Sequence, residues 1–353
     1  MFILQSILYW APFRIDALGL VTILGAESMN VAVGTLLYSP ATEWLPILGG
    51  YIFGNNSFTD PQPGFVLYNV TDGIMATDVS AWFTRWLLRH PTTYSSTVIR
   101  LRTDGAEISA GERAFGWMLG CITMLPILSL SAAIGDWWGF ANVAAMMVSV
   151  AVRQRMVSCL RNSIDHNVDS FALDPGEIVK VFLTMPNGKA VTIIAPRQAV
   201  VNCLLTDPKP RQPRWYLVLR GLGWAAFGIH VVTLGMATLF SQLLTVVVLL
   251  AGSVATGIGL GARPHMLGKK LRLEVEQGDP SWHRSKTYAR LQLTETEEDY
   301  MVHWSLFPQR KNQFWWDKYR RNEAAIRAEL AAGSSDLMEE KEKSSTVKPT
   351  FSI

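Results

Sequence analysis

The most constraining feature of this chain is an uncharged run of 42 residues, 221–262, in which His230 is the only residue that can become charged. At 1.5 Å of rise per residue, a helix of that length would measure roughly 63 Å, about twice the hydrocarbon thickness of a bilayer. The run therefore predicts two membrane-spanning helices joined by a tight turn. Charged residues make up only 17% of the chain, against about a quarter in soluble domains.

A second apolar run lies between Arg113 and Arg153 and is interrupted only by Asp136. Asp136 is followed by two tryptophans, which is typical of a turn at a membrane interface, where indole rings prefer to lie. This run predicts another pair of spans, and Pro126 could kink the first of them. The second is short, so it is either tilted little or extended past Arg153 by snorkelling.

Residues 15–38 form a less certain fifth span, because Glu27 and Asn30 lie near its middle. An interfacial or re-entrant helix is the alternative. The first dozen residues lack a basic region and a small-residue cleavage site, which argues against a signal peptide.

The distribution of Lys and Arg predicts the orientation. The loop 153–214 carries nine and the segment from residue 263 onward carries sixteen, so both are expected in the cytosol. Two glycosylation sequons, at Asn55 and Asn69, would instead require a lumenal loop and a sixth span near residues 74–88. Five spans are favoured and six are the alternative; the sequence does not decide between endoplasmic reticulum and plasma membrane.

The expected fold class is mainly α: a polytopic helical membrane protein with a small cytosolic β-hairpin–helix module and a helical C-terminal tail. The predicted segments are 1–38 with the first span, a polar loop 39–112, a transmembrane hairpin 113–152, a cytosolic loop 153–214, a second transmembrane hairpin 215–262, a helical tail 263–332 and a disordered end 333–353.

The cytosolic loop contains a hairpin signal. Residues 178–185 and 190–194 alternate apolar and polar positions on either side of Pro186-Asn187-Gly188-Lys189, and Asn-Gly adopts positive φ at both turn positions at low cost. Pro196 then fits the first turn of a helix that stops before Thr206.

The tail predicts two helices. Thr294 and Glu297 have capping-box spacing, and a second helix is expected over 312–330. The aromatic and basic side chains of the second helix predict either an anchor at the lipid headgroups or packing on the cytosolic hairpin. They are Phe314, Trp315, Trp316, Lys318, Arg320 and Arg321.

Three stretches also carry a resemblance. The run RGLGWAAFGIHVVTLGMATLFSQLLTVVVLLAG, the hairpin VKVFLTMPNGKAVTI and the segment TYARLQLTETEEDYMVHWSLFPQRKNQFWWDKY resemble a family of filamentous-fungal multispanning membrane proteins over residues 113–319. The resemblance implies a fungal source, and it supplies no activity and no catalytic residues.

The candidate catalytic residues are Glu27, His230 and Asp136, because ionisable groups inside spans are costly to bury. A Glu27–His230 pair could relay protons or act as a general acid. The alternative is that each satisfies a polar contact between helices, for example His230 with Gln242, Asn142 or a carbonyl.

Other chemical signals are weak. Asp72 and Asp78 do not match diphosphate-binding spacing, and Gly257, Gly259 and Gly261 are expected to form a helix end rather than a nucleotide site. No P-loop, HExxH or GxSxG motif occurs, so no cofactor or metal is predicted. The three cysteines, Cys121, Cys159 and Cys203, have neither disulfide nor zinc spacing.

The sequence therefore favours a non-enzymatic scaffold, regulator or assembly factor, whose partners are the lipid bilayer and proteins bound through the hairpin and tail, with no nucleic acid. One alternative is a membrane-embedded tailoring enzyme, such as a terpenoid cyclase, acting on a lipophilic secondary metabolite. A second alternative is a subunit of an oligomeric transporter or channel.

Overall fold

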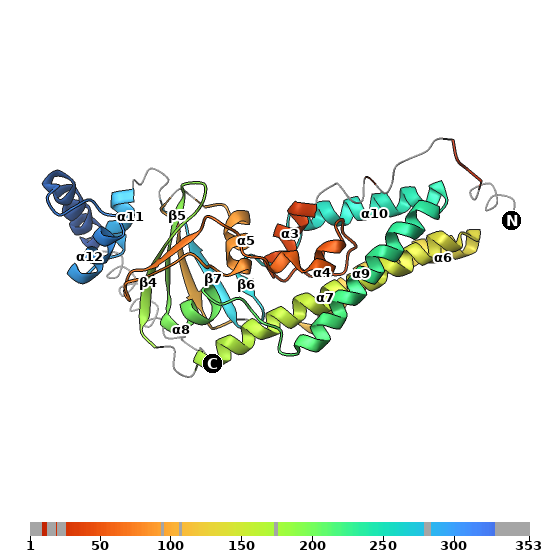
Figure 1. The fold of residues 1–353 in the computed structure, drawn as a ribbon, viewed down its shortest axis with the longest axis horizontal. Coiled ribbons are helices and arrows are strands. Elements are labelled where there is room, and N and C mark those ends of the chain that lie inside the picture. Colours follow the sequence, from red (N-terminus) through yellow and green to blue (C-terminus); the bar gives the residue numbers. More distant parts are fainter. Residues whose placement is uncertain are drawn as a thin grey trace, which may run out of the picture.

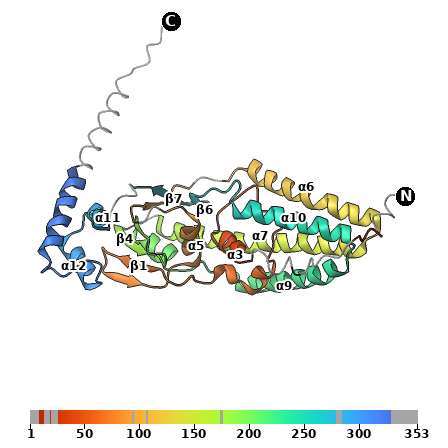
Figure 2. The same cartoon turned by 90° about the horizontal axis from the view of Figure 1, so that it is seen from above.

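Within the described residues, four helices are long and apolar enough to cross a membrane: α6 (Ala110–Ile134), α7 (Trp137–Ala172), α9 (Pro213–Met236) and α10 (Leu239–Gly257). The computed structural model describes residues 9–12, 19, 26–92, 95–105, 108–172, 176–278 and 284–328. The four helices form a bundle at one end of an elongated molecule, a sheet lies in the middle, and a helical tail lies at the other end (Figure 1). Figure 2 shows the same order from above.

Capping residues explain where the helices of the two transmembrane-length hairpins begin and end. A capping box of Ser109 and Glu112 begins α6, and Gly135, at φ 86°, ends it in the left-handed conformation that favours glycine. Thr238 caps the start of α10, directly after α9. The two connections lie at the end of the bundle away from the sheet, here called the distal end; the opposite end is the sheet-proximal end.

Helix α7 is 36 residues long and continues well past Arg153, whereas a short helix is expected from the apolar run alone. After Arg153 the apolar residues Met156, Leu160, Ile164 and Val168 recur every fourth position and are buried in the core of the sheet region. A second, amphipathic half therefore continues the same helix from the bundle onto the sheet.

The sheet has seven strands in the order β2-β1-β4-β5-β3-β7-β6. The strands are β1 (Val66–Asn69), β2 (Ile74–Ala76), β3 (Val98–Arg102), β4 (Ile178–Thr184), β5 (Ala190–Pro196), β6 (Met266–Leu267) and β7 (Leu271–Glu276). The predicted hairpin is confirmed as β4–β5, paired from Ile178↔Pro196 to Thr184↔Ala190. It is the centre of a larger sheet, whereas the sequence indicates only a small hairpin–helix unit.

The hairpin turn differs from the predicted one. Gly188 has φ 76° and its N–H donates to the Met185 carbonyl at 3.1 Å, but Asn187 is not among the residues with positive φ. This geometry is a type I turn with Pro186 at its first central position, followed by a left-handed glycine. The helix expected after Pro196 is present as α8 (Arg197–Ala199) and the π-helical η2 (Val200–Leu204).

The segment 39–112, expected as a polar loop, supplies strands and helices. It contains α4 (Tyr51–Asn55), η1 (Ser57–Thr59), α5 (Ala81–Arg89) and the strands β1 to β3. Strand β3 runs parallel to β5 and antiparallel to β7, so this segment joins the loop and the tail in one sheet. Helix α5 occupies the place of the alternative sixth span, but it has nine residues and its Trp82 and Trp86 are buried in the core.

The predicted first span is described only in part. Residues 13–18 and 20–25 lie outside the described residues, and α3 (Ala26–Gly34) ends four residues before Tyr38. Leu36 then adopts φ 56° and Leu37 forms a β-bridge to Leu267. The described part of this segment therefore packs in the sheet-proximal region, and the remainder of the predicted span lies outside the described residues.

Residues 40–54 enter the bundle from its sheet-proximal end and are here called the re-entrant segment. The Leu48 N–H donates to Ser253 Oγ on α10 at 2.8 Å, and Leu48 belongs to the apolar cluster of the bundle. Glycines allow its close approach: a Cβ at Gly120 of α6 would lie 2.7 Å from the Trp44 Cβ. Gly120 lies ten residues into α6, so the segment penetrates about 15 Å along that helix.

A single methyl group tests this packing. A Cβ at Gly252 of α10 would overlap the carbonyl oxygen of Pro46, whereas a Cβ at Gly228 of α9 would meet nothing within 4 Å. Gly252→Ala is expected to lower the free energy of unfolding by about 1–3 kcal/mol, because the segment must shift. Gly228→Ala is the matched control and is expected to leave stability unchanged or slightly raised. Thermal unfolding of the detergent-solubilised protein measures both, and equal midpoints for the two variants would contradict the packing.

The tail packs on the outer side of the hairpin. It contains α11 (Arg284–Arg290), α12 (Glu295–His303) and a helix over 313–328. The predicted capping box of Thr294 and Glu297 is confirmed. Trp316 and Tyr319 are buried in one cluster with Phe307 and with Phe182 of β4. Of the two predicted roles for the aromatic residues, this arrangement corresponds to packing on the hairpin.

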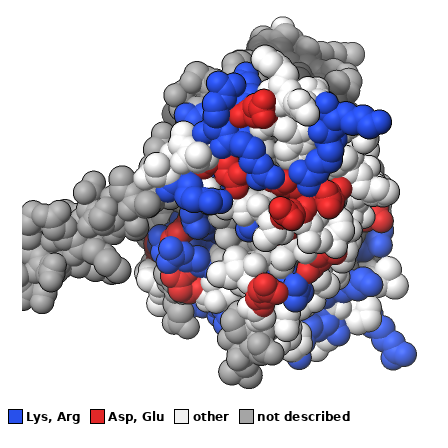
Figure 3. Space-filling model, turned by 90° about the vertical axis from the view of Figure 1, so that its left-hand side faces the viewer, with Lys and Arg blue, Asp and Glu red and all other residues white. Residues whose placement is uncertain are grey.

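The outer face of the tail does not have the character of a lipid anchor. Figure 3 shows acidic and basic side chains interspersed over this end of the molecule, which lies at the far side of the sheet from the bundle. Phe314 is 81% exposed, while Trp315 stacks on Tyr319 with ring centroids 5.4 Å apart.

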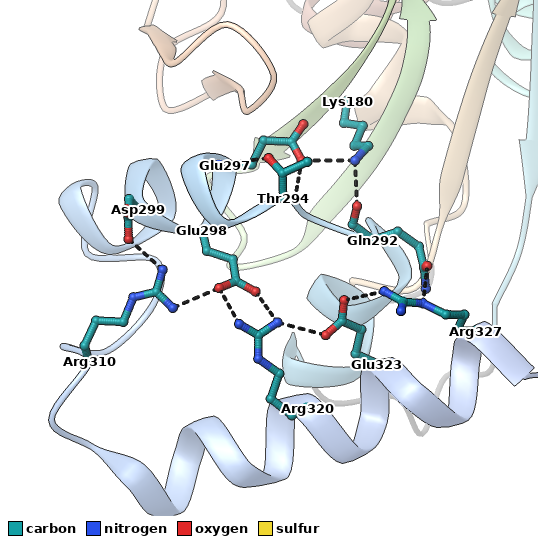
Figure 4. A network of polar contacts seen from close by, with 10 residues as sticks. All are labelled: Lys180, Gln292, Thr294, Glu297, Glu298, Asp299, Arg310, Arg320, Glu323 and Arg327. Atoms are coloured by element: carbon teal, nitrogen blue, oxygen red, sulfur yellow. Dashed lines mark hydrogen bonds and ion pairs between the residues drawn. The ribbon is translucent and has the colours of Figure 1, made fainter.

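A network of ion pairs holds the tail together (Figure 4). Glu298 is fully buried and pairs with Arg310 at 2.8 Å and with Arg320 at 2.7 Å. Glu297 pairs with Lys180 of β4 at 3.0 Å, which ties the tail to the hairpin. The Arg310 guanidinium also lies 4.2 Å from the Trp316 ring centroid, a cation–π distance.

Candidate functional site

The three predicted catalytic residues lie in different surroundings. Glu27 is exposed in the first turn of α3, whereas Asp136 and His230 are buried in the bundle. Within the part of the chain that the structure describes, no hydrogen bond or ion pair joins any two of them. The expected Glu27–His230 pair is not formed.

Asp136 serves as a double cap at the distal end. Its Oδ1 accepts a hydrogen bond from the Gly139 N–H at 2.9 Å, and its Oδ2 accepts from the N–H and hydroxyl of Thr238 at 3.0 and 2.7 Å. Because Thr238 itself caps α10, the carboxylate joins the α6–α7 turn to the α9–α10 turn. These bonds give Asp136 a structural explanation.

His230 lines a cavity of about 20 Å³ against the re-entrant segment, beside Pro46 and Gly50. That volume is enough for one water molecule. Its Nδ1 has no partner among the described residues. Of the suggested partners, Gln242 donates to the carbonyls of Leu234 and Ala237.

Asn142 of α7 is a partner of the His230 ring through its backbone, while its side-chain amide donates to Thr245 at 2.9 Å. Among the described residues, Arg153 is the only charged residue that lines the His230 cavity, and no carboxylate lies there to exchange a proton with His230.

A larger cavity, of about 60 Å³, lies at the sheet-proximal end of the bundle. Its charged lining residues are Arg89 of α5, Arg153 and Arg161 of α7, and Glu43 of the re-entrant segment. Three guanidinium groups and one carboxylate leave a formal charge of +2 on this lining. We refer to it as the arginine cavity.

Two of the arginines hold the re-entrant segment in place. Arg153 is buried, and its Nη2 donates to the carbonyls of Glu43 and Leu45, each at 2.7 Å. Arg161 forms an ion pair with the Glu43 carboxylate and donates to the Leu36 carbonyl at 2.8 Å. Chain carbonyls that enter an apolar bundle need such donors, because no water is present to hydrate them.

Arg89 holds the end of α10. Its Nη2 donates to the carbonyls of Gly257 and Thr256 at 2.7 and 3.1 Å, at the helix end where unpaired carbonyls favour a cation. Burial lowers the pKa of Arg89, and no acidic group contributes to that shift.

The sequence marks these arginines only as indicators of the cytosolic side. Arg153 and Arg161 lie about two helical turns apart, a spacing that could have suggested one shared face had α7 been expected to continue. Arg89 and Glu43 come from distant segments, so only the fold brings the four together.

The remaining weak signals have structural explanations. Asp72 forms a bidentate contact with Arg197, with the shortest distance at 2.6 Å, and Gly259 and Gly261 form a turn after α10 with φ near 70°. Over the described residues, no group of three His, Cys, Asp or Glu side chains could hold a metal ion.

Comparison of this chain with protein-family models, curated proteins and solved structures found no match. The resemblance to fungal membrane proteins stays a prediction.

Proposed function

We propose that this chain is a multi-pass membrane protein that acts as a non-enzymatic scaffold or regulator, holding its sheet and tail at the cytosolic face for partner proteins. The observation that carries the proposal is the continuous α7, which runs from the bundle into the core of the sheet. A rigid connection of this kind fixes the orientation of the sheet module relative to the bundle.

The outward faces of the four long helices support the membrane placement. They expose large apolar side chains that a soluble protein would rarely leave unpartnered. Examples are Trp117, Ile122, Leu217, Val232, Val247 and Val254.

We infer four crossings after residue 109, with the basic loop and tail in the cytosol. Because β1 to β3 share one sheet with β4 and β5, residues 66–102 lie on that same side. Asn69 is 2% exposed and donates to Asp72 at 2.7 Å, so its amide is not available for glycosylation. The fifth span predicted over residues 15–38 lies partly outside the described residues, and the proposed placement of the four long helices does not depend on it.

The second candidate is a subunit of an oligomeric transporter or channel. The re-entrant segment favours it, since irregular chain inside a bundle is common in such proteins. The cavities next to this segment measure about 20 and 60 Å³, too small for a pore within one subunit.

The discriminating experiment is the size and composition of the protein extracted from its native membrane in mild detergent. The scaffold proposal expects a complex larger than the chain alone, containing a second protein in fixed ratio. Lys318→Glu with Arg321→Glu, two exposed changes on the outer face of the tail, is expected to reduce the complex. Glu27→Gln and His230→Gln are expected to preserve it.

Other outcomes favour the alternatives. A complex of identical chains would favour the transporter or channel subunit. Metabolite profiling of a deletion strain tests the alternative of a membrane-embedded enzyme. Loss of a lipophilic product that is not restored by expressing either Glu27→Gln or His230→Gln would overturn the scaffold proposal.

A further inference from the structure

The arginine cavity has the composition of an anion site. Its lining combines three guanidinium groups with one carboxylate, and the hydroxyls of Thr35 and Thr42 also line it. Its volume of about 60 Å³ corresponds to several water molecules, which is room for a tetrahedral anion.

The hydrogen bonds of the arginines leave donors free. Every hydrogen bond that Arg153 makes to the described residues uses Nη2, so its Nε and Nη1 are available. Arg89 bonds only to carbonyl groups, including a 3.4 Å contact to Ala32. Arg161 is the one lining arginine with a carboxylate partner, Glu43.

The position of the cavity relative to the bundle identifies the class of anion. It lies beside Gly259, two residues beyond the end of α10, and beside Arg153, where the apolar half of α7 ends. If the bundle crosses a membrane, this is the level of the cytosolic headgroups. Basic pockets between helices at that level are suited to phosphate groups.

We propose that the arginine cavity binds a phosphate-bearing anion through Arg89 and Arg153. The anion is either the headgroup of an acidic phospholipid or a free phosphate compound, and both present the same oxygens to the guanidinium forks. A bound anion would offset the excess positive charge between α5, α7 and the re-entrant segment. The site is independent of whether the chain acts as a scaffold.

The test uses the full chain in nanodiscs, with two probes. Native mass spectrometry counts the lipids retained by the protein from discs that contain phosphatidylserine, or from discs of phosphatidylcholine alone. In a second measurement, the midpoint of thermal unfolding is recorded at increasing concentrations of inorganic phosphate. Saturable retention of phosphatidylserine alone identifies a headgroup site, and stabilisation by phosphate identifies a site for a free anion. The absence of both would overturn the proposal.

Variants separate binding from folding. Arg89→Gln is expected to weaken binding of the active probe roughly tenfold, as for loss of a charge-assisted hydrogen bond. Arg220→Gln is the matched control: Arg220 donates to the carbonyl of Gly54, at the end of the re-entrant segment, and to that of the next residue, Asn55, but does not line the cavity.

Glu43→Gln provides a change in the opposite direction. It removes the only carboxylate of the lining and releases Arg161, so binding is expected to tighten at least about threefold. A misfolded variant would not bind more tightly. Weaker binding by Glu43→Gln, or equal effects of Arg89→Gln and Arg220→Gln, would contradict the assignment.

Discussion

Arg153→Met is expected to lower the free energy of unfolding by about 2–4 kcal/mol, one of the two largest effects in this protein. Methionine retains much of the apolar volume but donates no hydrogen bonds. The carbonyls of Glu43 and Leu45 would lose donors at 2.7 Å inside the bundle, while removal of a buried cation offsets part of the cost. Thermal unfolding and hydrogen exchange of residues 40–54 measure the change.

The matched control is Arg155→Met, an exposed position on the same helix, which is expected to change stability by less than about 0.5 kcal/mol. Exchange should rise in the re-entrant segment of the Arg153 variant and stay unchanged in the sheet. A uniform rise, or equal unfolding of both variants, would mean that Arg153 does not hold this segment.

Glu298→Gln is expected to release the helix over 313–328, at a cost of about 1–3 kcal/mol. The carboxylate is fully buried between Arg310 and Arg320, and an amide would replace one of its acceptor oxygens with a donor facing a cation. The two arginines are 42% and 47% exposed, so water can partly solvate them and reduce the cost.

Limited proteolysis measures this release, because the new cleavage sites would be the basic residues of the tail helix. Glu295→Gln, at an exposed position of the same α12, is the control and should keep the wild-type rate. Loss of the ion pairs without faster cleavage would show that the apolar cluster around Phe307 and Tyr319 holds the helix alone.

The sequence indicated the parts of this fold whose signals are local. The long uncharged runs correspond to the membrane-length helices, and Pro-Asn-Gly-Lys marks the β4–β5 turn. The capping box of Thr294 and Glu297 begins α12 where expected. Each of these patterns lies within one short window of the chain.

The parts that could not be predicted depend on contacts between distant segments. Strand β3 has five residues and pairs with β5 and β7, about 90 and 170 positions further along the chain, so no nearby turn indicates it. The re-entrant segment is apolar but too short to span a membrane, and its Pro46, Gly49 and Gly50 are typical of a loop, so no sequence pattern predicts its place in the bundle.

The same limit applies to the candidate site. His230 was selected because it is ionisable within a span, and it is buried as that argument requires. For the arginines that line the larger cavity, the sequence indicates only the orientation of the chain, since their convergence on Glu43 depends on the fold. A buried cation at the end of an apolar run is therefore a candidate for a functional site, as is an ionisable group in its middle.

We propose that residues 40–54 lie inside a four-helix membrane bundle, with the sheet on the cytosolic side. The most direct test of this arrangement is labelling by a membrane-impermeant maleimide of single cysteines placed in a cysteine-free chain. Native Cys203 contributes little to maleimide labelling before it is replaced, because burial raises the pKa of its thiol to about 12 and disfavours the reactive thiolate.

Three positions are sufficient for that measurement: Trp137, exposed at the distal end, Asn187, exposed in the hairpin turn, and Leu48, buried in the re-entrant segment. In sealed vesicles with the distal face outward we expect Trp137→Cys to react; Asn187→Cys should react only after permeabilisation, and Leu48→Cys only after denaturation. Labelling of Leu48→Cys at the rate of either exposed site in folded protein, or of Asn187→Cys from outside, would contradict this arrangement.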